Sequence, residues 1–244
     1  MPNGSTISDE LKRKLRTAQS VFVLTGAGIS AESGVPTFRG GGGAAVWKGM
    51  PLSVISSAEM VARDLKEVWA WFDYRRGVVG KVEPNEAHHA LARWQDAFRR
   101  FALVTQNIDG LHEAAGSREV QELHGNIWRA RCVKCNARRD LRDEEMRPPV
   151  CHACGDRMRP DVVLFGESLP EGVYERAARA AATCDVCFVI GTSALVYPAA
   201  GLPEIAAGTN AYLVEVNPER TPLSNLCDEV IEGRAGEILP LFGI

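Results

Sequence analysis

The chain has 244 residues, 45% of them hydrophobic and 24% charged, which is typical of a globular protein that buries a sizeable core. Its net charge of −3 at pH 7 disfavours a general binder of nucleic acid or anionic membranes, because such proteins carry a basic surplus. No segment reads as a secretory signal or a membrane span. We therefore expect a cytoplasmic protein without specific nucleic-acid or membrane partners, whose paired cysteines hold a metal and not disulfides.

Short apolar runs that alternate with helix-like segments predict a parallel sheet. A surface helix is expected at residues 10–19. Buried strands are expected at 21–25, 101–105, 186–191 and 211–216, and helices between them at 86–98 and 171–182. Uninterrupted apolar strands in this alternation are typical of a sheet covered on both faces. The expected fold class is α/β, with a Rossmann-like doubly wound parallel sheet.

Two segments interrupt this alternation. Residues 40–43 are four glycines that lead into a helical stretch at 57–76, and residues 129–159 are polar and rich in Arg and Cys. Both are interpreted as insertions that together form a smaller lobe. The expected division is a Rossmann-like domain of residues 1–40, 90–128 and 160–244, and a small domain made of a helical module, 41–89, and a cysteine-rich ribbon, 129–159.

The segment GAGISA at 26–31 follows the first predicted strand directly and fits the pattern G-x-G-x-x-A. Residues without side chains let backbone N–H groups approach a diphosphate at the start of a helix, although a plain tight turn fits the pattern as well. An ordinary dehydrogenase adds an acidic residue about 20 positions later. No carboxylate lies between Glu32 and Glu59, which disfavours hydride transfer. The glycine run suits a loop that closes over a cofactor, or a disordered surface loop.

Two close cysteine pairs predict a zinc site. Two residues stand between Cys132 and Cys135, two between Cys151 and Cys154, and fifteen between the pairs. Four thiolates at this spacing are typical of a tetrahedral zinc that holds a small domain together and leaves no open position for catalysis. A structural zinc is expected, with redox or chance pairing as the alternatives. His152, inside the second pair, is expected to face solvent.

The other cysteines, Cys184, Cys187 and Cys227, are expected to be small core residues, since residues three apart on a strand point to opposite faces and cannot easily share a metal. The chain around the zinc pairs is basic. Its cationic residues there are Arg129, Arg131, Lys134, Arg138 and Arg139. A solvated face is the expected role, and contact with an acidic partner is the alternative.

Polar side chains follow the second apolar strand at its carboxyl end, where an open parallel sheet places its ligand. The residues are Gln106, Asn107, Ile108 and Asp109. Further on, His124 stands beside a glycine just before the cysteine-rich insertion. It is the best candidate for a general base, since imidazole titrates near neutral pH. Capping or packing is expected of His88 and His89, and packing beside the site of His112.

Several motifs occur in order: TGAGISAESGVPTFRG from Thr25, TQNIDGLH from Thr105, LHG from Leu123, the two cysteine pairs, FGE at 165–167, GTS at 191–193 and VNP at 216–218. Together they resemble the sirtuin (Sir2) family of NAD-dependent protein-lysine deacylases, over residues 21–237. The resemblance implies that the acyl group of an acylated lysine in a protein substrate is transferred to ADP-ribose while nicotinamide is released. It implies NAD as co-substrate and a structural Zn²⁺.

The resemblance also implies residue roles. His124 is the catalytic base, Asn107 and Gln106 position the ribose, and Asp109 with the Ile108 backbone binds the nicotinamide amide. The other implied NAD contacts are Gly26, Ala27, Gly28, Ser30, Phe38, Arg39, Gly191, Thr192, Ser193, Asn217 and Ala235. The substrate peptide adds as a strand against the segment that contains Val163, Phe165, Gly166 and Glu167.

The acyl preference depends on Phe72 and Arg75. Similar sirtuins that remove succinyl or malonyl groups carry Tyr-x-x-Arg, whose phenol and guanidinium hold the acyl carboxylate, and here Phe72 replaces the tyrosine. One lost hydrogen bond to a charged group is worth about 1.5–3 kcal/mol. A deacetylase is therefore expected, with desuccinylation weakened if present. The alternative for Arg75 is a surface residue of an Arg75–Arg76 pair.

Two other functions share parts of this pattern. A protein mono-ADP-ribosyltransferase would use a protein side chain to attack the same ribose carbon. A zinc-ribbon module that senses NAD would bind it and release no nicotinamide. The intact His124 favours deacylation over both.

Overall fold

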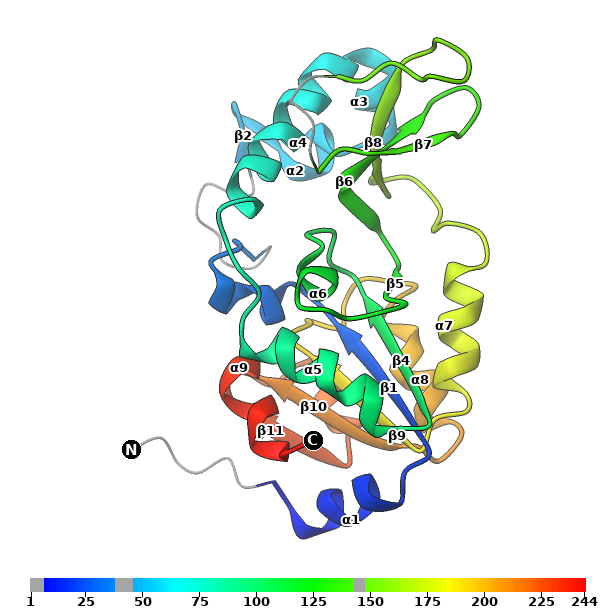
Figure 1. Cartoon of the computed structure of the whole chain (residues 1–244). Helices are drawn as coiled ribbons and strands as arrows, with labels where there is room; N and C mark the ends of the chain where they lie inside the picture. Colours follow the sequence, from blue (N-terminus) through cyan, green and yellow to red (C-terminus); the bar gives the residue numbers. More distant parts are fainter. Residues whose placement is uncertain (1–6, 38–45, 143–147) are drawn as a thin grey trace.

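The structure is a computed structural model that describes residues 7–37, 46–142 and 148–244. The glycine run and two expected NAD contacts, Phe38 and Arg39, lie outside the described residues. Two lobes are visible, with the larger at the bottom of Figure 1 and the smaller at the top.

The large lobe is built on a parallel sheet of six strands in the order β11-β10-β9-β1-β4-β5. The strands are β1 (Ser20–Thr25), β4 (Arg100–Thr105), β5 (Gln121–Glu122), β9 (Val186–Ile190), β10 (Tyr212–Asn217) and β11 (Glu229–Glu232). Every residue of β1 and β9 is buried, because both faces of the sheet are covered. The prediction of a doubly wound α/β fold is confirmed.

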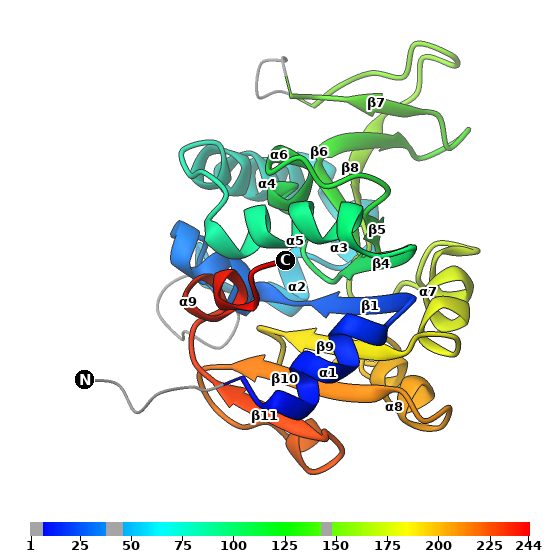
Figure 2. The same cartoon turned by 60° about the horizontal axis from the view of Figure 1, so that its bottom comes forward.

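Helices form a layer on each face of this sheet (Figures 1 and 2). One core contains residues of α1 (Asp9–Thr17), α5 (Glu86–Ala97), α9 (Ala235–Ile238) and the 3-10 turn η3 (Leu239–Phe242), and the other contains residues of α7 (Val173–Ala181) and α8 (Gly201–Ala207). Trp94 of α5 lies at the centre of the first core, with its ring 5.0 Å from that of Phe188. This buried aromatic contact packs α5 against β9.

The small lobe has its own core, which joins a helical part to a three-stranded antiparallel sheet of order β7-β6-β8. Its elements are β2 (Val46–Trp47), β3 (Met50–Pro51), α2 (Leu52–Ile55), α3 (Ala58–Arg63), α4 (Leu65–Val79), β6 (Gly125–Cys132), β7 (Arg138–Asp140) and β8 (Met158–Val162). The expected helical stretch is split at Asp64, whose carboxylate accepts a hydrogen bond from Glu67 N at 3.0 Å. Asp64 thereby caps the start of α4 and ends the preceding helix.

The cysteines outside the ribbon lie in or against the core beneath α7. Cys184 and Cys187 are buried, as predicted, and Cys227 is half-buried. Cys184 lies before the first residue of β9, so strand alternation does not describe this pair; its Sγ donates to Ala181 O at 3.2 Å. Among the helices that the structure describes, none combines the length and apolar character needed to cross a bilayer.

Candidate active site

The loop after β1, which begins η1 (Ala27–Ser33), packs against the loop after β9. The Gly26 N–H donates to Ile190 O at 3.0 Å and the Gly28 N–H to Gly191 O at 2.7 Å. A Cβ on Gly28 would lie 2.7 Å from Gly191 Cα, and one on Gly191, whose φ is +60°, would lie 2.4 Å from Ile29 N. These glycines are therefore required for the contact between two loops. Their N–H groups are bonded within the protein, so the physical reason differs from the diphosphate approach that the pattern suggested.

Ser30 connects two of the predicted site residues. The Asn107 amide donates one hydrogen bond to Ser30 Oγ at 3.1 Å and another to Gly26 O at 3.0 Å. Ser30 Oγ donates in turn to Asp109 Oδ2 at 2.8 Å. Because both amide hydrogens of Asn107 are used, its carbonyl oxygen is the group that can accept a hydrogen bond from a ligand. Burial raises the pKa of Asp109, against the hydrogen bonds from Leu111 and Ser30.

Buried polar groups that the sequence does not reveal as a network support these residues from behind. His88 Nδ1 accepts from Asn85 N at 3.3 Å, so its Nε2 carries the hydrogen and faces Ser30 Oγ at 3.4 Å. Burial lowers the pKa of His88 to about 4 and keeps it neutral. The predicted capping role of His88 is confirmed, and it also supports Ser30. No feature of the sequence indicated that Ser30 and His88 would be in contact, since they lie 58 positions apart.

The backbone of Asn107 is held by a pair of threonines. Its N–H donates to Thr105 Oγ1 at 3.0 Å, and Thr25 Oγ1 donates to the same oxygen at 2.8 Å. Thr25 Oγ1 also lies 2.9 Å from Nε2 of His112, which is buried as predicted. β1 and β4 are neighbours in the sheet, with Thr25 opposite Thr105. The strand register therefore brings together the two threonines that hold Asn107.

His124 is held in the tautomer that a general base requires. Its Nδ1 lies 2.8 Å from Gln106 O. A carbonyl oxygen can only accept, so Nδ1 carries the hydrogen and Nε2 keeps a free lone pair. Burial lowers the pKa of His124, while the bond to Gln106 raises it by a smaller amount. The imidazole is therefore neutral at neutral pH.

The expected adenosine-side residues gather around Thr192. Gln106 Nε2 donates to Thr192 Oγ1 at 2.9 Å, and Asn217 Nδ2 donates to Thr192 O at 2.8 Å. Ser193 follows in the same loop and is half-buried, and Ala235 is buried at the start of α9. The carboxyl ends of β4, β9 and β10 thus bring Gln106, Thr192 and Asn217 together, as the Rossmann pattern predicts.

Arg75 and Phe72 lie on α4 but in different surroundings. Phe72 is 3% exposed and belongs to the core of the small lobe. The guanidinium of Arg75 lies 5.5 Å from the Trp71 ring, and its buried Nε has no hydrogen-bond partner among the described residues. Burial lowers the pKa of Arg75, and the charge of Asp109 raises it. The alternative of a surface Arg75–Arg76 pair does not fit, because Arg75 is half-buried and Arg76 is buried and donates to Leu141 O at 2.7 Å.

The segment after β8 is shaped by an ion pair. The Arg159 guanidinium contacts both carboxylate oxygens of Glu167, one of them at 3.0 Å, and the same carboxylate accepts from Leu164 N at 2.9 Å. Phe165 is 54% exposed and Gly166 has a φ of +85°. Val163 N donates to His124 O at 2.9 Å, which ties the segment to the candidate base. Glu167 is thus committed to shaping this segment.

The four predicted cysteine ligands converge in the ribbon. All four sulfurs lie within 4.8 Å of one another, and three of the distances, Cys132 to Cys154, Cys135 to Cys151 and Cys135 to Cys154, are 3.5 Å. A tetrahedral zinc with Zn–S bonds of about 2.3 Å sets sulfurs roughly 3.8 Å apart, so the cluster fits this metal. His152 is exposed, as predicted.

Comparison with known proteins gives one consistent result. The Sir2 family profile matches residues 26–198. A curated relative from Thermus thermophilus, named NAD-dependent protein deacylase, is 51% identical over 222 residues, 89% of this chain and 87% of that protein. A solved complex of a Sir2 homologue with NAD is 38% identical, covers 99% of this chain and 94% of its own, and has a TM-score of 0.90. A Sir2 structure bound to acetylated peptide is 29% identical, with a TM-score of 0.84 and 97% of each chain covered. The chain therefore belongs to the Sir2 family of sirtuins.

Proposed function

We propose that the protein is an NAD-dependent protein-lysine deacylase in which His124 is the catalytic base. The observation that carries this proposal is the hydrogen bond from His124 Nδ1 to Gln106 O, at 2.8 Å, which leaves Nε2 unprotonated. The curated relative at 51% identity carries the name of this activity. NAD supplies a ribose carbon for the acyl oxygen and nicotinamide as the leaving group.

The residues of this chain bind and orient the substrates, and one of them, His124, accepts a proton. The carbonyl oxygen of Asn107 is directed by two donated hydrogen bonds and accepts from a ribose hydroxyl. Nε2 of His124 would take the proton of a ribose hydroxyl and so make that oxygen a nucleophile for the acyl carbon, and one water would supply the oxygen needed for the lysine to leave as a free amine. Asp109, held by Ser30, and the Ile108 backbone bind the nicotinamide amide. Holding these groups rigidly before the ligand arrives reduces the reorganisation needed in the transition state.

The other proposed NAD contacts follow the fold. The proposed residues on the diphosphate side are Gly26, Ala27, Gly28 and Ser30, and those proposed on the adenosine side are Gly191, Thr192, Ser193, Asn217 and Ala235. Phe38 and Arg39 complete the set. The close contact of the first loop with Gly191 supports placing these two groups in one binding cleft.

The substrate is an acylated lysine in another protein, and its peptide adds as a strand to the segment of Val163, Phe165, Gly166 and Glu167. Exposed Phe165 and the Arg159–Glu167 pair, which fixes the turn at Gly166, support this role. Acetyl is the proposed acyl group. Phe72 offers no hydroxyl, while the unpartnered Nε of Arg75 retains a weaker interaction with an acyl carboxylate such as succinyl.

We also propose the division into a Rossmann-like domain (1–40, 90–128 and 160–244) and a small domain (41–89 and 129–159), which the separate core of the small lobe supports. A structural Zn²⁺ held by Cys132, Cys135, Cys151 and Cys154 stabilises the ribbon. The free cysteines support a reducing compartment, for which we propose the cytoplasm, and the net charge of −3 supports the proposal of no nucleic-acid or membrane partner.

The test is mass spectrometry of an acetyl-lysine peptide incubated with and without NAD. The native protein is expected to remove the acetyl group only with NAD, and His124→Ala is expected to lose about a hundredfold to ten-thousandfold in rate. His152→Ala, which removes an exposed histidine, is the matched control. Nicotinamide release that needs no acyl-lysine would favour ADP-ribosyl transfer and contradict the proposal.

A further inference from the structure

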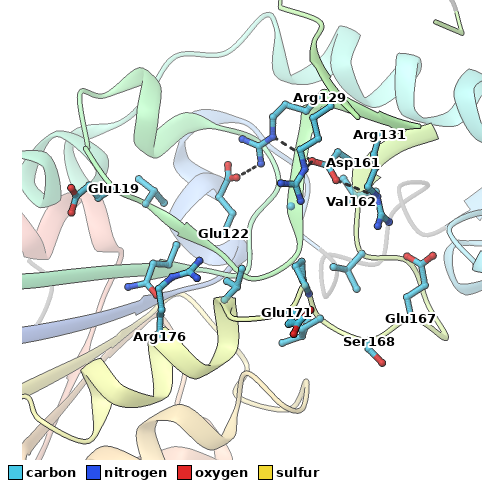
Figure 3. A pocket seen from close by; sticks show the side chains of 18 residues that line it. Glu119, Glu122, Arg129, Arg131, Asp161, Val162, Glu167, Ser168, Glu171 and Arg176 are labelled. Atoms are coloured by element: carbon cyan, nitrogen blue, oxygen red, sulfur yellow. Dashed lines mark hydrogen bonds and ion pairs between the residues drawn. The ribbon is translucent and has the colours of Figure 1, made fainter. Parts of the chain in front are cut away.

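A charged groove with a volume of about 840 Å³ opens beside the proposed peptide-binding segment. Its walls come from β5, β6 and β7, the end of β8, and the stretch that leads into α7 (Figure 3). Val163 and Glu167 line the groove and also belong to the segment proposed to bind the peptide. The groove thus adjoins the segment proposed to bind the peptide.

Three arginines stand in one row across the ribbon sheet. Arg131 of β6 is opposite Arg138 of β7 on one side and opposite Arg159 of β8 on the other. Like charges directly opposite one another destabilise a sheet unless carboxylates offset them. Asp161 forms ion pairs with Arg131, at 3.5 Å, and with Arg138, at 2.9 Å. Glu167 forms an ion pair with Arg159.

The carboxylates on this wall are fewer than the guanidinium groups they contact. Arg129 joins the same Asp161 at 3.6 Å and also pairs with Glu122, so three guanidiniums share two carboxylates. Arg131 Nε is buried without a hydrogen bond, and among the described residues no carboxylate other than Asp161 pairs with Arg131 or Arg138. Each guanidinium carries several N–H donors, so donors remain for an added carboxylate.

The groove also contains acidic side chains, so the location of the excess guanidinium groups decides where an added carboxylate can bind. Glu167 forms its ion pair with Arg159, and its charge also acts on Arg131. Figure 3 shows Glu119 at the end of the groove away from Arg131, and Glu171 on the wall below it. The Arg138 side chain is 62% exposed and that of Arg131 32%, so both are accessible from the groove. At the end nearest Val163 and Glu167, three guanidiniums (Arg131, Arg138 and Arg159) thus face two carboxylates (Asp161 and Glu167).

We propose that Arg131 and Arg138 bind a carboxylate of the substrate protein close in sequence to the acylated lysine. The enzyme then prefers acyl-lysines with a neighbouring Asp or Glu. This inference rests on the proposed deacylase function, and it assigns the basic ribbon face to an acidic partner in place of solvent alone.

The test compares acetyl-lysine peptides that differ only in Asp against Asn, with the substituted position moved one residue at a time on either side of the lysine. We expect at least one position at which Asp raises kcat/KM through a lower KM, by about threefold to tenfold at low salt, and a smaller ratio at high salt. Equal rates for all Asp and Asn peptides would overturn this inference but leave the proposed function intact. Failure of every peptide, including the neutral one, would instead contradict the proposed function.

Variants locate the contact. Arg138→Gln is expected to abolish the preference for Asp and leave the rate on the Asn peptides unchanged, and Arg138→Glu to reverse it. Arg13→Gln, an exposed arginine of α1, is the matched control and should keep the preference. Zinc content checks that each variant keeps its ribbon. An Asp preference that survives Arg138→Glu with zinc retained would place the contact elsewhere and overturn the assignment.

Discussion

The large lobe fixes its functional groups by backbone register and hydrogen bonds, whereas the ribbon of the small lobe depends on four thiolates and on ion pairs. In the large lobe, Thr25 and Thr105 are opposite each other in the sheet and hold Asn107, and Gly28 bonds directly to Gly191. In the ribbon, Arg131 and Arg138 face each other across two strands and share Asp161. The candidate catalytic residues therefore lie where backbone register and hydrogen bonds set their positions, and the cationic side chains lie in the part built around the four-cysteine cluster.

Removing zinc should separate the two regions most sharply. Structural zinc contributes folding free energy of about 10–16 kcal/mol in small zinc domains, so chelation is expected to unfold the ribbon and abolish activity. Hydrogen exchange should rise across β6–β8 and stay low in β1 and β9. Cys227→Ser, which lies outside the four-cysteine cluster, should leave zinc content and hydrogen exchange in the ribbon unchanged. Equal loss of protection in both lobes would show that the large lobe depends on the zinc as well.

Gly191→Ala tests the rigid region. The added Cβ would meet Ile29 N at 2.4 Å with a φ of +60°, so we expect a loss of about 3 kcal/mol or more in the free energy of unfolding, together with loss of NAD affinity. Gly155→Ala in the ribbon has a φ of +72° but nothing within 4 Å of its Cβ, and should cost only about 1–2 kcal/mol. Denaturant unfolding and calorimetric NAD binding give both numbers. Similar costs for the two alanines would show that the loop contact is not rigid.

Phe72→Tyr sharpens the acyl assignment where the lobes meet. One hydrogen bond to a charged group is worth about 1.5–3 kcal/mol, so the ratio of kcat/KM for succinyl over acetyl peptide should rise roughly tenfold to a hundredfold. Phe72→Tyr combined with Arg75→Gln should lose that gain. A native enzyme that already prefers succinyl strongly would contradict the acetyl assignment.

The smallest expected effect is the pH dependence. Nε2 of His124 must be neutral to accept a proton, and burial lowers its pKa below the usual 6.5. Activity should therefore be flat through neutral pH and fall only as the pH drops through this lowered pKa. His88, with a pKa of about 4, also disfavours protonation in the folded state, so stability should decrease between about pH 6.5 and 4. A kcat that already declines above pH 7 as the pH is lowered would contradict the neutral base.

The sequence predicted the central strands and the zinc site well. Residues 21–25 and 186–190 are continuous apolar runs because both sheet faces are covered, and the cysteine spacing is dictated by one metal geometry. β11 was not predicted, because Glu229–Glu232 is short and half charged and pairs only at the sheet edge. The split of the helical stretch at Asp64 depended on a cap that periodicity does not reveal.

The site was predicted as a set of residues but not as a network. Ser30 and His88 lie 58 positions apart, and Thr25 and His112 lie 87 positions apart, so only the folded sheet brings them together. The role of Gly28 was attributed to a ligand, whereas its Cβ position is closed by Gly191. The sequence also did not predict that the Nε atom of Arg75 is buried, because two adjacent arginines are typical of an exposed surface.

Deacylation by His124 can be tested by counting the products in one incubation of native enzyme with acetyl-peptide and NAD. We expect one nicotinamide for every lysine freed, no nicotinamide without acyl-lysine, and almost no free lysine from His124→Ala although it still binds NAD. Lysine freed without nicotinamide, or at the native rate by His124→Ala, would contradict this expectation.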